Sequence, residues 1–174
     1  GLTKWQGEYY ARTLPACKAV VRTSWLFGSG APQNFVNRIA NRLEHEKTIS
    51  VLDDQTDAPT SVEDLAQVLE PLADRMIQET KKRPASKFHE TFHVCNRNHA
   101  TRYEMALFTR DFLQRPARVT KTDPEKIDGR LALRPAYAVM STKKIERFLG
   151  IKMRPWQESL KAYLESEFSA CVSS

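Results

Sequence analysis

The sequence lacks the features that most directly assign a function. No stretch approaches roughly 18 consecutive apolar residues, which excludes a membrane-spanning helix. There are only three cysteines, Cys17, Cys95 and Cys171, and none belongs to a CxxC pair. Their odd number and wide spacing argue against a disulfide framework and a zinc site. They favour the cytoplasm or another reducing compartment inside the cell.

Glycine is scarce, with 6 residues in 174, and the chain contains neither GxGxxG nor GxxGxxG. These residues therefore do not include the glycine-rich loop that holds a cofactor's pyrophosphate after the first strand of a dinucleotide-binding sheet. Histidine is also scarce. His89, His93 and His99 are close in sequence, but "TFHVCN" is typical of a strand and no acidic partner is in register. This argues against a metal site.

The composition is that of an ordinary globular domain, with 41% hydrophobic and 28% charged residues. Lys and Arg number 27 and Asp and Glu 21, an excess of 6 positive charges. Both signs are mixed along the chain, and the densest basic run, "KKRP" (81–84), ends a predicted helix, where cations are favoured. The charge therefore suits an anionic ligand such as a nucleotide and argues against direct binding of nucleic acid.

The first half of the chain alternates helical and extended patterns. Apolar residues recur at helical spacing in three segments, and short apolar runs typical of buried strands separate them. The expected helices cover 2–14, 33–47 and the stretch from Ser61 to about Thr80, and the expected strands cover "AVV" (19–21), 48–55 and 90–96. This order predicts an α/β fold with helices packed on a largely parallel sheet.

The second half has a different character. Helices are expected at 101–115, 141–150 and 155–168. Residues 116–140, between the first two, hold three prolines and a short extended piece, "ARVTKT". Thr101 and Glu104 match a capping box, and Ser141 is the expected cap of the next helix. We therefore expect residues 1–80 to form the C-terminal part of a doubly wound Rossmann-like, NAD(P)-binding sheet, with some cap elements interleaved. Residues 81–174 are expected to form mainly a small α+β cap.

The ordered motifs resemble one enzyme family. "GLTKWQGE", "AVVRTSWLFG", "VLDDQTDAPTSVEDLA", "TFHVCN…TRYEMA" and "LRPAYAVMSTKKIERFLGI…PWQESL" follow one another over nearly the whole chain. In this order they resemble the dTDP-4-dehydrorhamnose reductases, extended short-chain dehydrogenases that reduce a nucleotide-linked keto-sugar with NADPH or NADH. The regulatory β subunit of methionine adenosyltransferase shares this fold, and the chain is similar to it as well.

The resemblance implies a role for Lys4. The family's catalytic pair is Tyr-x-x-x-Lys, and the Lys matches Lys4, which puts the expected Tyr immediately before Gly1. A lysine ammonium one helical turn from a tyrosine lowers the pKa of the phenol, and the same ammonium can bind the nicotinamide ribose. The glycine loop and the catalytic Ser or Thr are expected upstream as well. We expect no catalysis from these 174 residues alone. Without the resemblance, Lys4 would be a solvated helix lysine.

The resemblance also implies contacts at the end of the "AVV" strand. Thr23 and Ser24 are expected near the nicotinamide, and Trp25 against the sugar. A core aromatic is the alternative interpretation of Trp25. These positions follow a strand whose carboxyl end should face the ligand, as in other open α/β sheets.

Four further residues are expected to bind the substrate. The candidates are Asn34, Gln55, Thr60 and Arg134, of which Arg134 would meet the diphosphate as a guanidinium fork. A helix cap is the alternative for Asn34, and a surface salt bridge is the alternative for Arg134. Asp57 stands where the family usually has glycine, and aspartate is among the residues that tolerate positive φ there.

Two functional hypotheses follow. The first is the C-terminal part of an NAD(P)H-dependent nucleotide-sugar reductase. The second is a non-catalytic subunit of a larger complex that keeps the fold. Because a half-sheet presents an unpaired edge, we expect a complementary N-terminal half or a larger protein assembly in either case.

Overall fold

The computed structural model describes residues 1–14, 18–31, 33–82, 88–123 and 134–168. The expected helix stop at Pro15, and the residues Cys17 and Cys171, lie outside these ranges. Within them, no helix combines the length and apolar character needed to cross a lipid bilayer. The helices are α1 (Leu2–Thr13), α2 (Phe35–His45), α3 (Val62–Lys82), α4 (Arg102–Phe112), α5 (Lys143–Leu149) and α6 (Trp156–Phe168).

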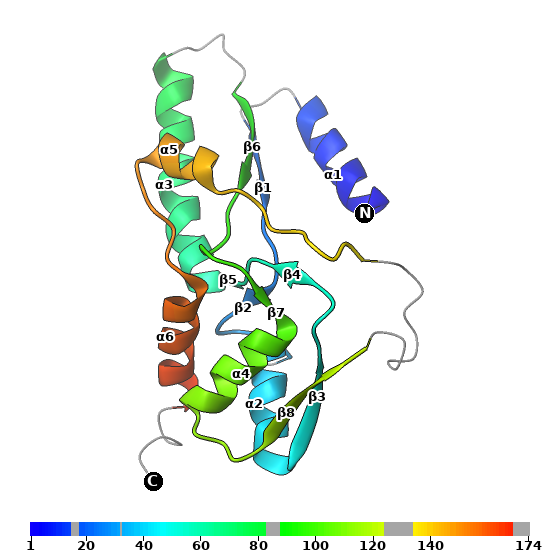
Figure 1. The fold of residues 1–174 in the computed structure, drawn as a ribbon. Helices are drawn as coiled ribbons and strands as arrows, with labels where there is room; N and C mark the ends of the chain where they lie inside the picture. Colours follow the sequence, from blue (N-terminus) through cyan, green and yellow to red (C-terminus); the bar gives the residue numbers. More distant parts are fainter. Residues whose placement is uncertain (15–17, 32, 83–87, 124–133, 169–174) are drawn as a thin grey trace.

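Three of the four strand pairs among the described residues are parallel, which confirms the predicted α/β class. They are β1 (Lys18–Arg22), β2 (Leu26–Phe27), β3 (Thr48–Leu52), β4 (Thr56–Asp57), β5 (Thr60–Ser61), β6 (His89–His93), β7 (Ala100–Thr101) and β8 (Arg118–Thr122). The pairs β1–β6, β2–β5 and β3–β8 are parallel, and β4–β7 is antiparallel. Both longer pairs join a strand before residue 80 to one after it. We call the β1–β6 pair with its covering helices one group and the β3–β8 pair with its covering helices the other. The two groups therefore interleave along the chain (Figure 1).

Each long strand pair has its own hydrophobic core. The β1–β6 pair is covered by α3 and α5, with Leu72, Phe92 and Ile145 in the cluster between them. The β3–β8 pair is covered by α2 and α4, with Leu43, Ile49 and others buried there. Amphipathic helices bury one apolar stripe against the sheet, and the spacing of four in α2 supplies that stripe.

Helix α6 joins the two groups. Its residues Leu160 and Leu164 are fully buried in a third cluster together with Phe27 of β2, Val36 of α2 and Met105 of α4. The elements β2, α2, α4 and α6 lie in the lower half of the molecule in Figure 1, and Trp25 and Phe35, which line the pocket described below, pack against this cluster. The helices α2, α4 and α6, near the pocket, therefore pack on one another through this cluster.

A buried carboxylate fixes the junction between the groups. Asp64, in the first turn of α3, is 4% exposed and accepts a hydrogen bond from the side-chain amide of Asn96 at 2.5 Å. The hydroxyl of Ser159 on α6 donates to the same carboxylate, and Arg154 donates to its other oxygen at 3.2 Å. The oxygen of the Asn96 side chain accepts the backbone N–H of Ser61 at 2.8 Å. The start of α3, the end of β6 and the start of α6 thus meet at one polar centre.

The helix caps agree with the sequence in two cases and differ in one. The hydroxyl of Ser61 accepts the backbone N–H groups of Glu63 and Asp64 at the start of α3, as expected. Thr101 and Glu104 form the expected capping box. The expected cap of α5 at Ser141 is wrong by one residue, because that helix begins after Thr142, which makes no side-chain cap bond.

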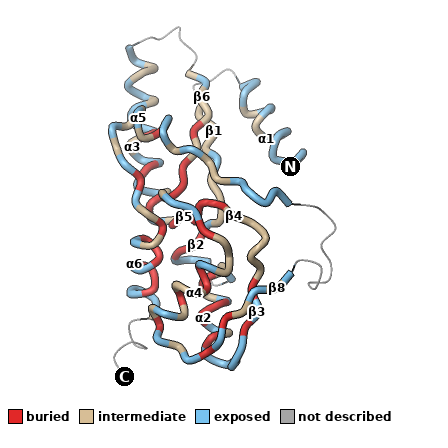
Figure 2. The backbone as a smooth tube through the Cα atoms, in the orientation of Figure 1, coloured by how far each residue is buried: buried red, intermediate tan, exposed pale blue. Residues whose placement is uncertain are grey.

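Helix α1 is the least buried helix among the described residues. It contains no buried residue, and the aromatic side chains Trp5 and Tyr9 stack on each other while both stay more than half exposed. Figure 2 shows the whole helix without a buried segment. Two ion-pair contacts between Glu8 and Arg22 of β1, at 2.7 Å each, hold α1 to the strand pair. The "AVV" strand itself is half-buried, which corrects the expectation of burial on both faces; the buried cluster beside it comes mainly from α3, β6 and α5, and α1 adds no buried residue.

Truncation of a core leucine in α6 should destabilise the chain strongly. Leu164 is fully buried, so Leu164→Ala is expected to lower the free energy of unfolding by about 2–5 kcal/mol through lost burial and a residual cavity. Leu69→Ala, at a position on α3 that is 42% exposed, is the matched control and should change it by less than ~0.5 kcal/mol. Urea unfolding followed by circular dichroism measures both. Equal losses for the two variants would contradict the assigned core.

The Glu8–Arg22 pair predicts a pH dependence. The hydrogen bond and charge of Arg22 hold the pKa of Glu8 below its ordinary value. A depressed carboxyl pKa adds stability above the unfolded pKa of about 4.3, and that stability is lost as the pH falls through the folded value. Glu8→Gln should therefore flatten the dependence of unfolding free energy on pH in the acid range. Parallel curves for the variant and the wild type would show that the pair contributes nothing.

Candidate functional site

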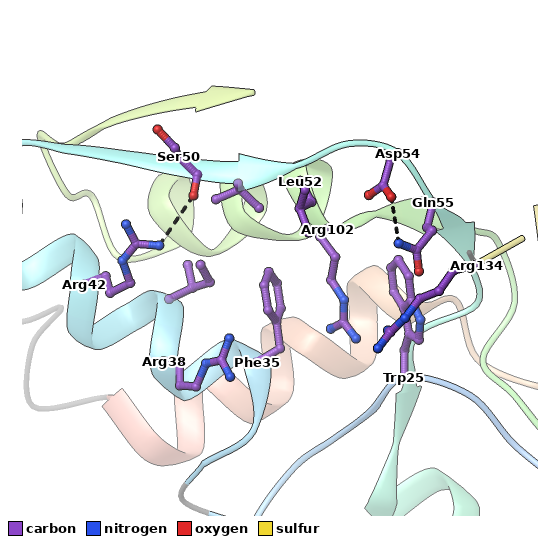
Figure 3. Close-up of a pocket in the computed structure, with 12 residues that line it drawn as sticks. Trp25, Phe35, Arg38, Arg42, Ser50, Leu52, Asp54, Gln55, Arg102 and Arg134 are labelled. Atoms are coloured by element: carbon purple, nitrogen blue, oxygen red, sulfur yellow. Dashed lines mark hydrogen bonds between the residues drawn. The ribbon is translucent and has the colours of Figure 1, made fainter. Parts of the chain in front are cut away.

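A pocket lies between α2 and the second half of β3 and extends past the carboxyl end of β3 to Trp25, three residues after β1. Its volume is about 380 Å³. It is bounded by α2, β3 and the segment after it, the start of α4, and Trp25 in the segment after β1 (Figure 3). The lining residues are Trp25, Phe35, Arg38, Ile39, Arg42, Ser50, Val51, Leu52, Asp54, Gln55, Arg102 and Arg134. Open α/β folds bind ligands at this edge.

Arg102 occupies the middle of the pocket. The central carbon of its guanidinium lies 4.0 Å from the ring centre of Trp25 and 4.5 Å from that of Phe35. Both rings attract the cation through their negative faces. Burial is the main cause that lowers the pKa of Arg102 to about 10, and the nearby charge of Arg38 adds to the effect. The side chain therefore remains protonated at neutral pH in a partly desolvated position.

Three guanidinium groups in the pocket make no ion pair with any described residue. Arg38 and Arg134 are exposed, Arg102 is partly buried, and all three line the pocket; in Figure 3 Arg102 and Arg134 lie near each other, while Phe35 stands between Arg102 and Arg38. Arg42 is different, because it makes a bidentate ion pair with Glu46 at 2.7 and 2.9 Å. The pocket is therefore positively charged, and an anionic ligand would complement it.

Thr23 and Ser24 lie where β1 ends. The Oγ1 atom of Thr23 is buried and has no hydrogen-bond partner among the described residues. The hydroxyl of Ser24 donates to the carbonyl oxygen of Ala58 at 2.8 Å and lies 3.9 Å from Sγ of Cys95. Ser24 therefore ties the end of β1 to the segment between β4 and β5. Thr23 keeps a buried polar atom that a bound group could satisfy.

Trp25 is held in an unusual backbone conformation. Its φ is 41°, in the left-handed region that few side chains of this size adopt. Its carbonyl accepts the backbone N–H of Thr60 at 3.2 Å, so the β2–β5 pairing fixes this turn. Asp57 does not have positive φ. Its carboxylate instead accepts the backbone N–H of Ala58 at 2.7 Å.

The structure brings together only some of the residues expected from sequence. Trp25, Gln55 and Arg134 line the pocket, and Gln55 donates to Asp54 at 2.9 Å. Thr60 is fully buried, and its hydroxyl donates to the carbonyl of Ala58. Thr60 therefore does not line the pocket, and its backbone N–H holds the carbonyl of Trp25, which does.

Asn34 and Lys4 lie outside the pocket lining. Asn34 caps α2: its oxygen accepts the N–H of Asn37 at 3.0 Å, and its amide nitrogen contacts Gly28, Ala31 and Tyr163. The helix-cap alternative therefore describes its observed contacts. Lys4 is exposed on α1.

The sequence interpretation missed two of the three unpaired guanidinium groups. Arg38 lies one turn after Phe35 on α2, and Arg102 directly follows the capping residue Thr101. A signal was present in each case. Helical spacing puts Phe35, Arg38 and Arg42 on neighbouring positions of one helix, and a residue at a helix start after a strand faces the strand-end edge.

The parallel strand pairs, their covering helices and a ligand pocket at the strand ends define a Rossmann-type α/β protein, of which the chain holds a part. It belongs to the family described as RmlD substrate binding domain, whose model matches residues 1–168. The resemblance inferred from the motif order is thereby confirmed.

Curated relatives agree with this family. The spore coat polysaccharide biosynthesis protein SpsK of Bacillus subtilis is 30% identical over 171 residues, which cover 98% of this chain and 55% of that protein. The dTDP-4-dehydrorhamnose reductase of Streptomyces griseus is 34% identical over 162 residues, covering 92% and 51%. The chain thus spans about half the length of the relatives that it matches.

Solved structures agree as well. A dTDP-4-dehydrorhamnose reductase from Clostridium acetobutylicum superposes with a TM-score of 0.81 at 29% identity, over 95% of this chain and 54% of that one. The Bacillus anthracis reductase, solved in complex with NADP, gives a TM-score of 0.77 at 26% identity, over 96% and 54%. A UDP-galactose 4-epimerase at 12% identity and a TM-score of 0.71 shares the fold.

The thiol beside Ser24 should be unreactive. Cys95 is fully buried, and burial raises the pKa of its thiol. Because the thiolate is the reactive form, the peptide that contains Cys95 should label with iodoacetamide far more slowly in the native protein than in urea. Ser24→Ala removes a hydrogen bond that lowers this pKa, so it should slow native labelling further where the packing is kept. Peptide mapping by mass spectrometry measures the rates. Equal rates in native and unfolded protein would contradict the burial of this thiol.

Proposed function

We propose that the chain is the substrate-binding, C-terminal part of an NAD(P)H-dependent reductase of nucleotide-linked keto-sugars. The single observation that carries this proposal is the arginine-lined pocket along α2 and the carboxyl half of β3, whose lining includes Trp25, the residue that follows Thr23 and Ser24 in the chain. A nucleotide-sugar carries a diphosphate, and three guanidinium groups without described ion-pair partners complement it. The family and the printed activities of its relatives support the same substrate class.

The residues at the end of β1 fit a nicotinamide cofactor. Thr23 offers a buried hydroxyl without a described partner, which a bound group would satisfy. Lys4 would bind the nicotinamide ribose, and Ser24 would line the same edge. When bound, the cofactor supplies the hydride. These side chains would bind and orient it, and Lys4 would also lower the pKa of the tyrosine that the resemblance places one helical turn before it.

The substrate would occupy the pocket. Trp25 offers a flat apolar surface for a sugar, Arg134 a fork for the diphosphate, and Gln55 a polar contact. Asn34 and Thr60 would act indirectly. Asn34 fixes the start of α2, which carries Phe35 and Arg38, and Thr60 fixes the turn at Trp25.

A complementary stretch of protein would complete the sheet. Within the described residues β1 pairs with β6 alone, so its other edge carries unpaired backbone groups. The exposed Trp5 and Tyr9 of α1 lack a covering partner in the same part of the chain. We propose that α1, β1, α3 and β6 continue a cofactor-binding sheet, and that most elements around β3 and β8 form the substrate cap. A split at residue 80 stays a prediction.

The decisive experiment measures NADPH oxidation with a dTDP-4-keto-6-deoxyhexose. It uses the protein that contains this chain together with the preceding Tyr and glycine loop expected from the resemblance. Turnover is expected, and Lys4→Met should lower kcat by at least about 100-fold, because it removes the charge that activates the acid. Lys152→Met, an exposed lysine after α5, is the control and should keep full activity.

Two outcomes would overturn the proposal. A protein with no tyrosine and no glycine loop ahead of this chain could not perform the reaction as stated. Absence of turnover with NADPH still bound would instead support the regulatory or structural subunit.

A further inference from the structure

We infer that Arg102 determines the pocket's specificity by holding two adjacent phosphoryl groups of a ligand. The inference rests on the proposed function and deepens it, because it assigns the main anion contact to a residue that the sequence motifs did not single out. Arg102 has no ion pair or hydrogen bond with any described residue, although it is partly buried between Trp25 and Phe35.

The position of Arg102 makes its charge more effective than that of its neighbours. Its guanidinium has already lost much of its water, while Arg38 and Arg134 remain exposed. A charge in a partly desolvated site interacts more strongly with an anion than one in water, and salt screens it less. Arg102 should therefore hold the anion, and the two exposed arginines should mainly attract it.

The surroundings of Arg102 fix where its N–H groups can bind. The two aromatic rings flank the guanidinium, and the capping box at Thr101 and Glu104 fixes the backbone directly before it. The side chain is thus ordered before a ligand arrives, which reduces the entropy lost on binding. Its free donors can meet phosphate oxygens in the cavity of about 380 Å³.

The number of unpaired charges favours two anionic groups over one. Arg38, Arg102 and Arg134 all line the same cavity; the charges of Arg38 and Arg134 lower the pKa of Arg102, and that of Asp57 raises it. A single phosphate or carboxylate can lie against only one guanidinium fork at a time. Two linked phosphoryl groups can meet Arg102 and an exposed neighbour at once, so a diphosphate should bind more tightly than a monophosphate.

The test is calorimetric titration of the chain with inorganic pyrophosphate, inorganic phosphate and thymidine 5′-diphosphate at several salt concentrations. Pyrophosphate should bind more tightly than phosphate. Arg102→Gln should weaken pyrophosphate and thymidine diphosphate binding by a similar factor of about 10 to 100, the loss expected for a charged hydrogen-bonded contact. Arg134→Gln should weaken binding less and should chiefly reduce its salt dependence.

Two further variants separate a specific contact from a folding defect. Arg102→Lys keeps the charge but loses the fork, so its affinity should lie between those of the wild type and Arg102→Gln. Arg118→Gln, at an exposed position on β8 outside the pocket, should bind as the wild type does. Circular dichroism confirms that each variant is folded.

Unchanged pyrophosphate affinity in folded Arg102→Gln would overturn the inference, and so would equal affinities for phosphate and pyrophosphate. Neither result depends on reductase activity. Conversely, a protein that fails to oxidise NADPH but loses diphosphate binding in Arg102→Gln would refute the proposed reaction and support the role of Arg102.

Discussion

The buried carboxylate of Asp64 is the constraint on which the arrangement of elements depends. It receives donors from Asn96 after β6, from Ser159 on α6 and from Arg154 before α6, and it lies in the first turn of α3. A buried carboxylate is costly unless its oxygens are hydrogen-bonded, so the three donors must stay where they are. Asn96 in turn holds the backbone of Ser61, which fixes β5 next to the turn at Trp25.

The same constraint explains how the pocket is formed. The β2–β5 pairing keeps Trp25 in its left-handed conformation, and Trp25 supplies one of the two rings beside Arg102. The other ring belongs to Phe35, the first residue of the helix that Asn34 caps. Two residues expected to touch substrate, Thr60 and Asn34, thus act on the walls of the site. The side chains of Asn34 and Thr60 form local hydrogen bonds with the backbone, so their polar atoms are not available to a ligand.

Local rules predicted most of the fold and only part of the site. The alternation of helical and extended patterns gave the α/β class, and short-range chemistry identified the caps at Ser61 and Thr101, because these depend on residues three positions apart or fewer. Local patterns place Arg38 on α2 and Arg102 at the start of α4, but that these two residues share one pocket depends on the packing of α2 against α4, which those patterns do not encode. The exposure of Trp5 and Tyr9 could not be predicted either. An apolar helix face predicts burial, but the pattern does not show which element covers that face. Lys4 has a role only through the family motif.

The distribution of burial separates the two binding roles that we propose for the protein. The residues around the pocket are anchored in clusters that include fully buried Ile49, Met105 and Leu160, whereas α1, which carries Lys4, buries no residue. The free energy that orders the pocket therefore comes from elements other than the helix that would bind the cofactor's ribose. Changes at α1 need not alter the positions of Trp25 and Arg102, because the backbone bond from Thr60 holds the turn at Trp25, the capping box holds the start of α4, and α1 contributes to neither. Anion binding in the pocket can consequently persist in a protein whose cofactor site is incomplete.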